Sequence, residues 1–202
     1  MERPALPWFL LGVALFFVGH ALDLLTLRVA VKALPVLALA WSVHRRGRVG
    51  ATVAFGLLLG GVGDVVLELG HFLPGLVAFL LGHIAYIVAF VSEDRRLRLQ
   101  EALPPLLFVA VLSAVCVPAA GTFAAPIVVY GLVIGAMAWR ASVRPGWLAV
   151  LGAWVFAFSD AMIAINKFVT PLEGIRPVIM VTYWTAQLLI ALSVPKVRAD
   201  AG

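Results

Sequence analysis

Two aspartates, Asp64 and Asp160, interrupt long apolar segments of the chain. Each comes late in its segment, in the dipeptides Gly63-Asp64 and Ser159-Asp160. A carboxylate at the centre of a membrane helix costs roughly 2.5–3.5 kcal/mol on insertion scales, so it normally faces a protein interior or a wet cavity. Two carboxyl groups in one such site can act as an acid and a base when their environments differ. The pair therefore predicts a shared site for proton-transfer chemistry, with Asp64 and Asp160 as catalytic candidates.

The helical face that carries Asp64 has small residues at intervals of four. Gly56, Gly60 and Asp64 lie on one face, and small residues there let another helix approach closely. This face predicts that Asp64 points into a contact between helices and not toward lipid. Glu68 follows one turn later, about 6 Å away. It is either a second carboxylate of the site or a solvated group at the membrane surface.

Other polar side chains of the apolar segments complete the candidate site. His83 is either a hydrogen-bonded packing residue or a functional partner of the aspartates, and Tyr183 shares a helical face with Gln187. Three roles are open for Lys32: it reaches the membrane surface, pairs with a carboxylate, or holds a phosphate group. The candidate substrate-binding residues are Lys32, Glu68, Tyr86, Asn166, Lys167 and Gln187.

The sequence has few features of a metal site or of a catalytic nucleophile. A zinc site needs three or four nitrogen, sulfur or oxygen ligands, and the set of His20, His83 and the two aspartates has no HxxxH or CxxC pair. We therefore predict no metal and no other cofactor. The single cysteine, Cys116, excludes an intramolecular disulfide and lies in an apolar stretch, which is typical of a packing residue. No serine occupies a nucleophile-elbow sequence, and there is no glycine-rich phosphate loop.

The composition places these residues in a membrane. Of the 202 residues, 63% are hydrophobic and 12% are charged, and the mean hydropathy is +1.08. Soluble domains are about half apolar, so the sequence predicts an integral, multi-pass membrane protein. The net charge of +5 comes from arginines in short gaps between apolar segments, which indicates membrane topology and not a nucleic-acid partner.

Apolar segments long enough for membrane helices recur between short breaks that contain Gly, Pro or Arg. They predict an all-α polytopic bundle of eight transmembrane helices, forming a single transmembrane domain over residues 1–202. The expected spans are 7–27, 29–43, 49–69, 72–91, 103–119, 124–141, 147–166 and 176–194. Between Pro104 and Met137 there is no charged residue and no His, so we expect this region, including Tyr130, to be scaffold without a chemical role.

The distribution of Lys and Arg predicts the orientation. The N-terminus and the gaps after even-numbered spans hold eleven of these residues, and the opposite side holds four. Because cytoplasmic loops carry the excess of positive charge, we expect both termini in the cytoplasm and the protein in a bacterial inner membrane. With a rise of about 1.5 Å per residue, Asp64, Asp160 and Tyr183 then lie in the outer half of the bilayer.

The two aspartates also occur in similar surroundings. Each is followed eight residues later by a phenylalanine, Phe72 or Phe168, then by a turn with Pro and Gly and by another apolar span with a tyrosine. The third and fourth spans thus resemble the seventh and eighth, which is consistent with a parallel 4+4 duplication. Membrane proteins commonly build sites between such repeats. The duplication predicts that Asp64 and Asp160 lie at equal depth.

The residues around both aspartates resemble a known family. Gly63–Leu67 and Phe72–Tyr86 resemble the central signature of the YhhN family of lysoplasmalogenases. Ser159–Phe168 and Thr182–Gln187 are similar to its C-terminal signature. Lys32–Pro35 resembles the Lys-Pro element of the family, with two residues between the Lys and the Pro. The resemblance covers nearly the whole chain.

The resemblance implies an eight-helix membrane hydrolase that cleaves the vinyl-ether bond of a lysophospholipid into a fatty aldehyde and a glycerophospho-headgroup. It implies functional roles for Asp64, His83, Asp160, Asn166 and Tyr183, because these positions match the family pattern. With Asp64 and Asp160 as the catalytic pair, we expect His83 and Tyr183 to be further catalytic residues that orient the aspartates or a water molecule. Acid and base catalysis by two carboxyl groups would suffice for this reaction, without a cofactor. The implied partners are the lysophospholipid substrate and membrane lipids, and the oligomeric state stays open.

Two other functions are open on the residues alone. Buried acids also bind protons in proton-coupled transporters of lipids or small molecules, although such proteins commonly have a pair of Gly- or Pro-broken helices that this chain lacks. A metal-dependent intramembrane lipid hydrolase is the other alternative. Flux into liposomes without product would indicate a transporter, and sensitivity to chelators would indicate a metal enzyme.

Overall fold

The computed structural model describes residues 5–196, and this part of the chain is helical with no strand. The predicted all-α class is therefore confirmed. The α-helices are α1 (Ala5–Ala21), α2 (Leu25–Lys32), α3 (Leu34–Val43), α4 (Gly47–Glu68), α5 (Phe72–Glu93), α6 (Leu103–Cys116), α7 (Ala124–Val143), α8 (Trp147–Ala164) and α9 (Ile175–Ser193). Short 3-10 turns, η1 (Leu99–Ala102), η2 (Val117–Ala119) and η3 (Gly121–Phe123), flank α6, and a π-helical turn, η4 (Ile165–Val169), extends α8.

The first two expected spans are divided differently in the structure. The first helix ends at Ala21 instead of residue 27, because the chain turns at Asp23 and α2 begins at Leu25. Asp23 has a φ of 51°, a left-handed conformation that Asp tolerates better than most residues. The expected span 29–43 consists of two helices that meet at Ala33. Pro35 lies in the first turn of α3 and has no N–H to continue the hydrogen bonding of α2, which accounts for the break.

Within residues 5–196, seven helical segments are long and apolar enough to cross a membrane, with α2 and α3 taken together as one of them. The 17-residue helix α1 is apolar but shorter. A polytopic helical bundle is thus confirmed, whereas the number of eight crossings stays a prediction. The bounds of α4 to α9 lie within three residues of those expected, apart from the 3-10 and π-helical extensions of α6 and α8.

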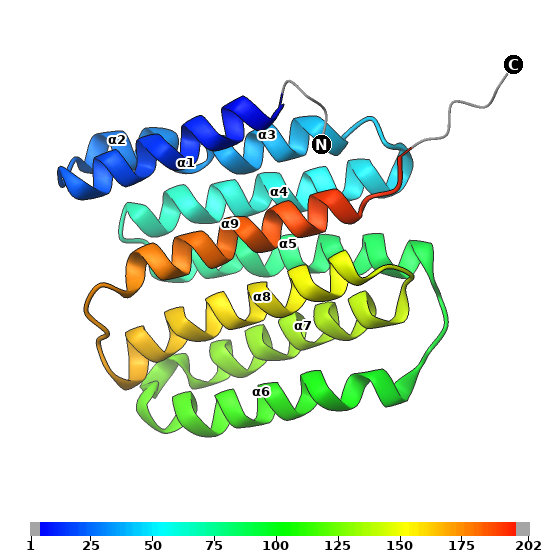
Figure 1. Cartoon of the computed structure of the whole chain (residues 1–202). Coiled ribbons are helices and arrows are strands. Elements are labelled where there is room, and N and C mark those ends of the chain that lie inside the picture. The colour runs from blue at the N-terminus through cyan, green and yellow to red at the C-terminus, as the bar shows by residue number, and fades with distance from the viewer. Residues whose placement is uncertain (1–4, 197–202) are drawn as a thin grey trace, which may run out of the picture.

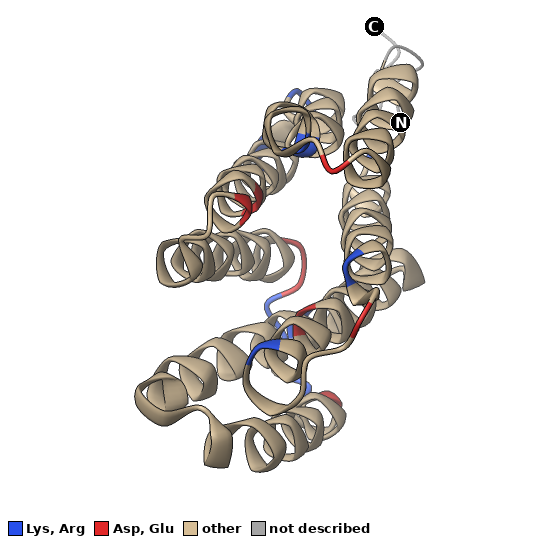
Figure 2. Ribbon diagram, turned by 90° about the vertical axis from the view of Figure 1, so that its left-hand side faces the viewer, with Lys and Arg blue, Asp and Glu red and all other residues tan. Residues whose placement is uncertain are grey.

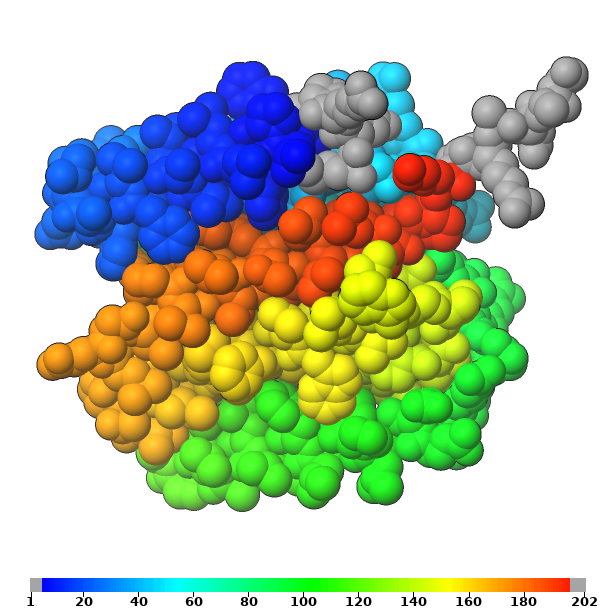
Figure 3. Space-filling view, in the orientation of Figure 1, coloured from blue at the N-terminus to red at the C-terminus, as the bar shows by residue number. Residues whose placement is uncertain are grey.

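The helices that carry the two aspartates belong to the two most extensive helix pairs, α4 with α5 and α8 with α9 (Figure 1). Helix α3 packs on both α4 and α9, and α7 packs on α5, α6 and α8. On the face shown in Figure 3, α9 fills the band between α1 and α8. This arrangement brings α4, α5, α8 and α9 around a common interior, although the proposed duplication itself stays a prediction.

The two ends of the bundle differ in charge. The end on the right of Figure 1 carries the loops 44–46 and 94–98, together with the C-terminal end of α9. These loops hold five of the arginines: Arg45, Arg46, Arg95, Arg96 and Arg98. Figure 2 views the opposite end, where α4 ends and α9 begins. The polar groups of the candidate site lie toward this second end.

Candidate active site

Glycines on α4 allow the neighbouring helices α5 and α9 to pack closely against it. A Cβ atom on Gly82 of α5 would lie 3.1 Å from the carbonyl oxygen of Gly56, so the two helices meet at backbone contact. A Cβ atom on Gly60 would lie 2.9 Å from the Tyr183 hydroxyl and 2.7 Å from Gln187 Nε2 of α9. This face of α4 therefore points into helix contacts, as its spacing predicted, and the missing side chains make room for polar groups of α9.

Asp64 lies one turn beyond Gly60 and is only 3% exposed. Its carboxyl group is beside the Tyr183 hydroxyl and within electrostatic range of Lys32 and Glu68. Its Oδ2 atom has no hydrogen-bond partner among the described residues. A buried acceptor without a partner costs about 1–3 kcal/mol, so this oxygen is suited to bind a ligand or a water molecule.

Buried hydrogen bonds fix the hydroxyl group of Tyr183. The Tyr86 hydroxyl donates to Gln187 Oε1 at 2.6 Å, and Gln187 Nε2 donates to the Tyr183 oxygen at 3.1 Å. Because the Tyr183 oxygen accepts this bond, its own proton remains available for Asp64. Tyr86 and Gln187 were expected to bind substrate. In the structure they instead form a chain of hydrogen bonds that ends at the Tyr183 hydroxyl and determines its orientation.

Asp160 has a second, separate set of partners. The Tyr130 hydroxyl of α7 donates a hydrogen bond to Asp160 Oδ2. His83 Nε2 lies 3.8 Å from the same oxygen, which is too long for a hydrogen bond. The His83 ring packs edge-on against Tyr130 and Phe156, with centroids 5.4 and 4.6 Å apart. Neither ring nitrogen of His83 has a partner within residues 5–196.

The two aspartates occupy neighbouring parts of one interior. The Phe156 ring contacts both Tyr183 and His83, and no hydrogen bond joins the two carboxyl groups in the described part of the chain. Aromatic rings lie between their partners: Phe79 and Phe156 pack edge-on against Tyr183, with centroid distances of 5.6 and 5.4 Å. Each carboxyl group therefore has its own environment, a condition that favours distinct acid and base roles.

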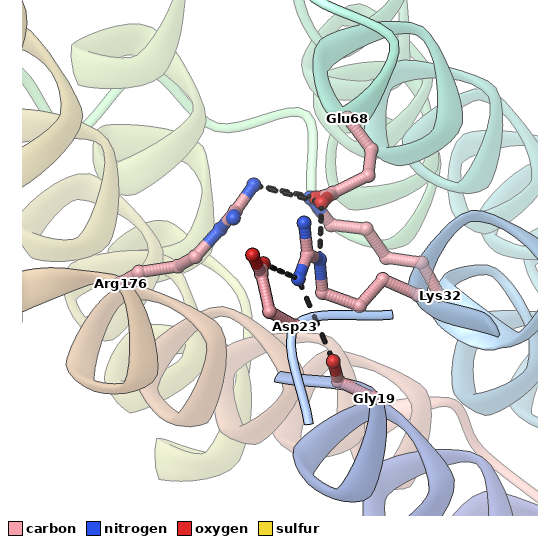
Figure 4. A network of polar contacts seen from close by, with 6 residues as sticks. Gly19, Asp23, Lys32, Glu68 and Arg176 are labelled. Atoms are coloured by element: carbon pink, nitrogen blue, oxygen red, sulfur yellow. Dashed lines mark hydrogen bonds and ion pairs between the residues drawn. The ribbon is translucent and has the colours of Figure 1, made fainter. Parts of the chain in front are cut away.

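Glu68 forms the centre of an ionic cluster at the end of α4 (Figure 4). Its side chain is fully buried, which excludes the solvated role left open by the sequence. Oε1 accepts from Arg28 Nε at 3.0 Å, Oε2 accepts from Lys32 Nζ at 2.9 Å, and Arg176 Nη2 contacts both oxygens at 2.8 Å. Three roles were open for Lys32, and in the structure it pairs with the carboxylate of Glu68.

The ionic cluster extends to the turn between α1 and α2. Arg28 Nη1 donates to Asp23 Oδ1 at 2.9 Å, and this bond holds the pKa of the Asp23 carboxyl below its usual range. Three cations thus face two carboxylates, which leaves one net positive charge. Arg176, at 44% side-chain exposure, is the most accessible of the three cations.

Asn166 and Lys167 lie on the π-helical turn η4. Asn166 Oδ1 accepts a hydrogen bond from the Leu172 N–H at 2.7 Å and so closes the loop before α9. The Lys167 ammonium lies 5.3 Å from the ring centroid of Phe72, at the N-terminus of α5. π-helical turns are frequent at functional sites, and this one begins five residues after Asp160.

An apolar cavity adjoins Asp160 between α5, α7 and α8. Its walls are almost entirely hydrocarbon, and the only polar side chains that line it are those of Tyr130 and Asp160. Asp64 does not line it. Phe72 and Phe168 lie at the end near η4, where they pack edge-on with centroids 5.7 Å apart. The cavity therefore gives Asp160, but not Asp64, an apolar binding space.

The expectation that Tyr130 is scaffold was wrong, because its hydroxyl binds one of the two aspartates. One signal in the sequence pointed to it: the chain has three tyrosines, and all three belong to this site. Arg28 was also missed, since its position suggested only a topology signal. Among residues 5–196, no group of three His, Cys, Asp or Glu side chains is close enough to hold a metal ion.

The fold and the site define a polytopic membrane helix bundle with one buried and one partly buried carboxyl group in a common interior. Residues 27–194 match the sequence profile of the YhhN family, so the chain belongs to the YhhN family. No solved structure matches the fold.

Curated relatives are named lysoplasmalogenases. The chain is 37% identical to lysoplasmalogenase TMEM86B of Homo sapiens over 170 residues, which cover 81% of this chain and 73% of the human protein. It is 34% identical to the lysoplasmalogenase of Mycobacterium bovis over 193 residues, 85% of this chain and 70% of that protein. Lysoplasmalogenase TMEM86A of Homo sapiens is 35% identical over 161 residues, 71% of this chain and 65% of that protein.

Proposed function

We propose that this protein is a lysoplasmalogenase-type hydrolase, which uses water to cleave the vinyl-ether bond of a lysophospholipid. The relatives at 32–37% identity support this activity. The observation that carries the catalytic assignment is that Asp64 and Asp160 have different partners in one interior, where the Phe156 ring packs against both Tyr183 and His83. Asp64, Asp160, His83 and Tyr183 are the proposed catalytic residues.

The proposed chemistry begins with transfer of a proton from one carboxylic acid to the vinyl carbon beta to the ether oxygen. The resulting oxocarbenium ion is stabilised by the other carboxylate, which also takes a proton from the attacking water. The hemiacetal then loses its hydroxyl proton to the first carboxylate, and the glycerol oxygen leaves with the proton of the second. The products are an aldehyde and the glycerophospho-headgroup, and both carboxyl groups return to their initial states.

The ionic cluster is the proposed site of the phosphate in the headgroup. Its net positive charge and the exposed guanidinium of Arg176 suit a phosphodiester, because Arg binds phosphate oxygens in a bidentate manner. Glu68 holds Lys32 and Arg28 in place for this contact. Lys167 and Asn166 border the same end of the bundle and are proposed to contact the headgroup from η4.

Gln187 and Tyr86 are proposed to support substrate binding indirectly, through the hydroxyl group of Tyr183. Gln187 and Tyr86 fix the Tyr183 hydroxyl, which in turn orients Asp64 or the attacking water. His83 has two unpartnered ring nitrogens near Asp160 and is proposed to hold the same water or the ether oxygen.

Aldehyde release by the purified protein tests this proposal. Lysoplasmalogen is supplied beside its saturated-ether and ester analogues, and we expect aldehyde from the vinyl ether alone. Asp64→Asn and Asp160→Asn should each reduce turnover by at least about 100-fold, the usual size of an acid or base contribution. Both variants should elute from a sizing column in detergent as the wild type does. Wild-type turnover in both folded variants would contradict the mechanism, and transport of lipid without aldehyde would contradict the activity.

A further inference from the structure

The cavity beside Asp160 differs from every other part of the candidate site in its polarity. Leu76, Ile127 and Ile163 are typical of its walls, and the hydroxyl of Tyr130 and the carboxyl of Asp160 are its only polar groups. Such a space suits a hydrocarbon chain, because transfer of apolar surface out of water is favourable and the wall is almost entirely hydrocarbon. The Asp160 side chain is 10% exposed and lies on the wall of this cavity.

The two oxygens of Asp160 have different environments. Oδ2 accepts the hydrogen bond of Tyr130 and is the oxygen nearest to His83. Oδ1 has no hydrogen-bond partner among residues 5–196, so it is the oxygen left to contact a ligand in the cavity. Tyr130 thus holds one oxygen of the carboxyl group and leaves the other without a hydrogen bond.

The surroundings of Asp64, in contrast, are polar. Asp64 does not line the cavity, and it lies within electrostatic range of Lys32 and Glu68 in the ionic cluster. A lysophospholipid has an anionic headgroup and a hydrocarbon tail, which these two regions would bind separately. The molecule then has one orientation, with its headgroup on the Asp64 side and its chain on the Asp160 side.

We infer that the cavity binds the alkenyl chain of the substrate, that Asp160 is the proton donor, and that Tyr130 is its positioning residue. This inference rests on the proposed function. In a vinyl ether the carbon that receives the proton is the one on the chain side, whereas water attacks the carbon bonded to oxygen. The acid must therefore lie beside the chain and the base beside the headgroup.

The first step is then fully assigned. The proton on Asp160 Oδ1 moves to the chain-side vinyl carbon, and the electron pair of the double bond forms the new C–H bond. Asp160 becomes a carboxylate, and the positive charge is shared by the ether oxygen and its neighbouring carbon. Water adds to that carbon and gives its proton to Asp64. Collapse of the hemiacetal returns a proton to Asp160 and releases the glycerol oxygen with the proton of Asp64.

Chemical rescue with formate distinguishes the two roles. In Asp160→Ala, formic acid should replace the lost donor, so the ratio of rescued to unrescued aldehyde release rises at least about tenfold from about pH 7 to about pH 5. In Asp64→Ala, the ionised formate is the active form, and it stays almost fully ionised from about pH 7 to about pH 5, so the ratio should stay within about twofold over the same range. If the rescue of Asp64→Ala rises with acidity and that of Asp160→Ala stays constant, the assignment is overturned, while aldehyde release by the wild type still supports the proposed function.

A double-mutant cycle tests Tyr130. Tyr130→Phe keeps the ring against His83 and removes the hydroxyl, so we expect kcat to fall about tenfold with KM within about twofold of the wild type. In the Asp160→Ala background the same change should have no further effect, because Tyr130 acts through Asp160. A tenfold loss in both backgrounds would overturn the positioning role, since an effect on folding alone would add to that of Asp160→Ala.

The chain site is tested by narrowing the cavity. Ala164 lies one turn after Asp160 and lines the cavity, so Ala164→Leu should raise KM for a long-chain lysoplasmalogen about tenfold more than for a short-chain one. The matched control is Ala125→Leu, at an exposed position of α7 that does not line the cavity. Equal effects of Ala164→Leu on both chain lengths would overturn the chain site, and absence of aldehyde release by the wild type would instead overturn the proposed function.

Discussion

Glu68 shows how one buried carboxylate organises its surroundings. Isolated in the interior it would be costly, but three cations from α2 and α9 contact its two oxygens. The cations in turn would repel one another without it. Glu68 therefore acts as the common counter-ion that allows a positively charged site to exist beside Asp64.

Replacement of this counter-ion should be strongly destabilising. Glu68→Gln keeps the shape but leaves Arg28, Lys32 and Arg176 uncompensated, so we expect the free energy of unfolding to fall by about 3 kcal/mol. The measurement is denaturant-induced unfolding in detergent micelles. The control is Glu173→Gln at an exposed loop position, expected within about 0.5 kcal/mol of the wild type. Equal stability of the two variants would show that the cluster does not depend on Glu68.

At the scale of the helices, some features follow from local chemistry and others do not. Pro35 is sufficient to predict the break between α2 and α3. Gly56 and Gly60 are sufficient to predict that Asp64 points toward the protein interior. The hydrogen-bond partner of Asp160 could not be predicted from the sequence, because the position of Tyr130 depends on how α7 packs against α5 and α8. Pairings that depend on which helices are neighbours, such as Glu68 with Arg176 more than 100 residues away, need the tertiary structure.

The loop between α5 and η1 is held by arginines. Arg140 donates to the carbonyl oxygens of Asp94 and Arg96, and Arg144 bonds both Glu93 and the Ser193 carbonyl at the end of α9. The Arg96 side chain and backbone N–H bond the Asp94 carboxylate. These contacts cap helix ends that would otherwise leave carbonyl oxygens unpaired.

This loop predicts a pH-dependent contribution to stability. The side-chain hydrogen bonds of Arg96 hold the pKa of Asp94 well below its usual range, so the folded state favours the carboxylate. The stabilisation is fully present above the pKa of about 3.9 that Asp94 has in the unfolded chain. It is lost as the pH falls through the lower pKa that Asp94 has in the folded protein. Asp94→Asn should therefore have a lower melting temperature than the wild type at pH near 7, and the difference should shrink below about pH 4. A difference that is constant with pH would exclude this origin.

At the scale of the whole molecule, the charges distinguish the two ends of the bundle and thereby its orientation. The loops 44–46 and 94–98 lie at one end with the end of α9, and the site with its ionic cluster lies toward the other. From the positive-inside rule we predict that the arginine-rich loops lie in the cytoplasm and that the headgroup side of the proposed site lies at the outer face. A lysophospholipid of the outer leaflet would then meet Arg176 without crossing the membrane.

Cysteine labelling in intact cells tests this orientation. The native Cys116 is fully buried, so a membrane-impermeant maleimide should not label the wild type. Leu97 is 71% exposed in the loop between α5 and η1, and Glu173 is exposed in the loop before α9. We expect labelling of Glu173→Cys in intact cells, and of Leu97→Cys only after the membrane is permeabilised. The reverse pattern would place the arginine-rich loops outside, and the ionic cluster would then accept lipid from the cytoplasmic leaflet.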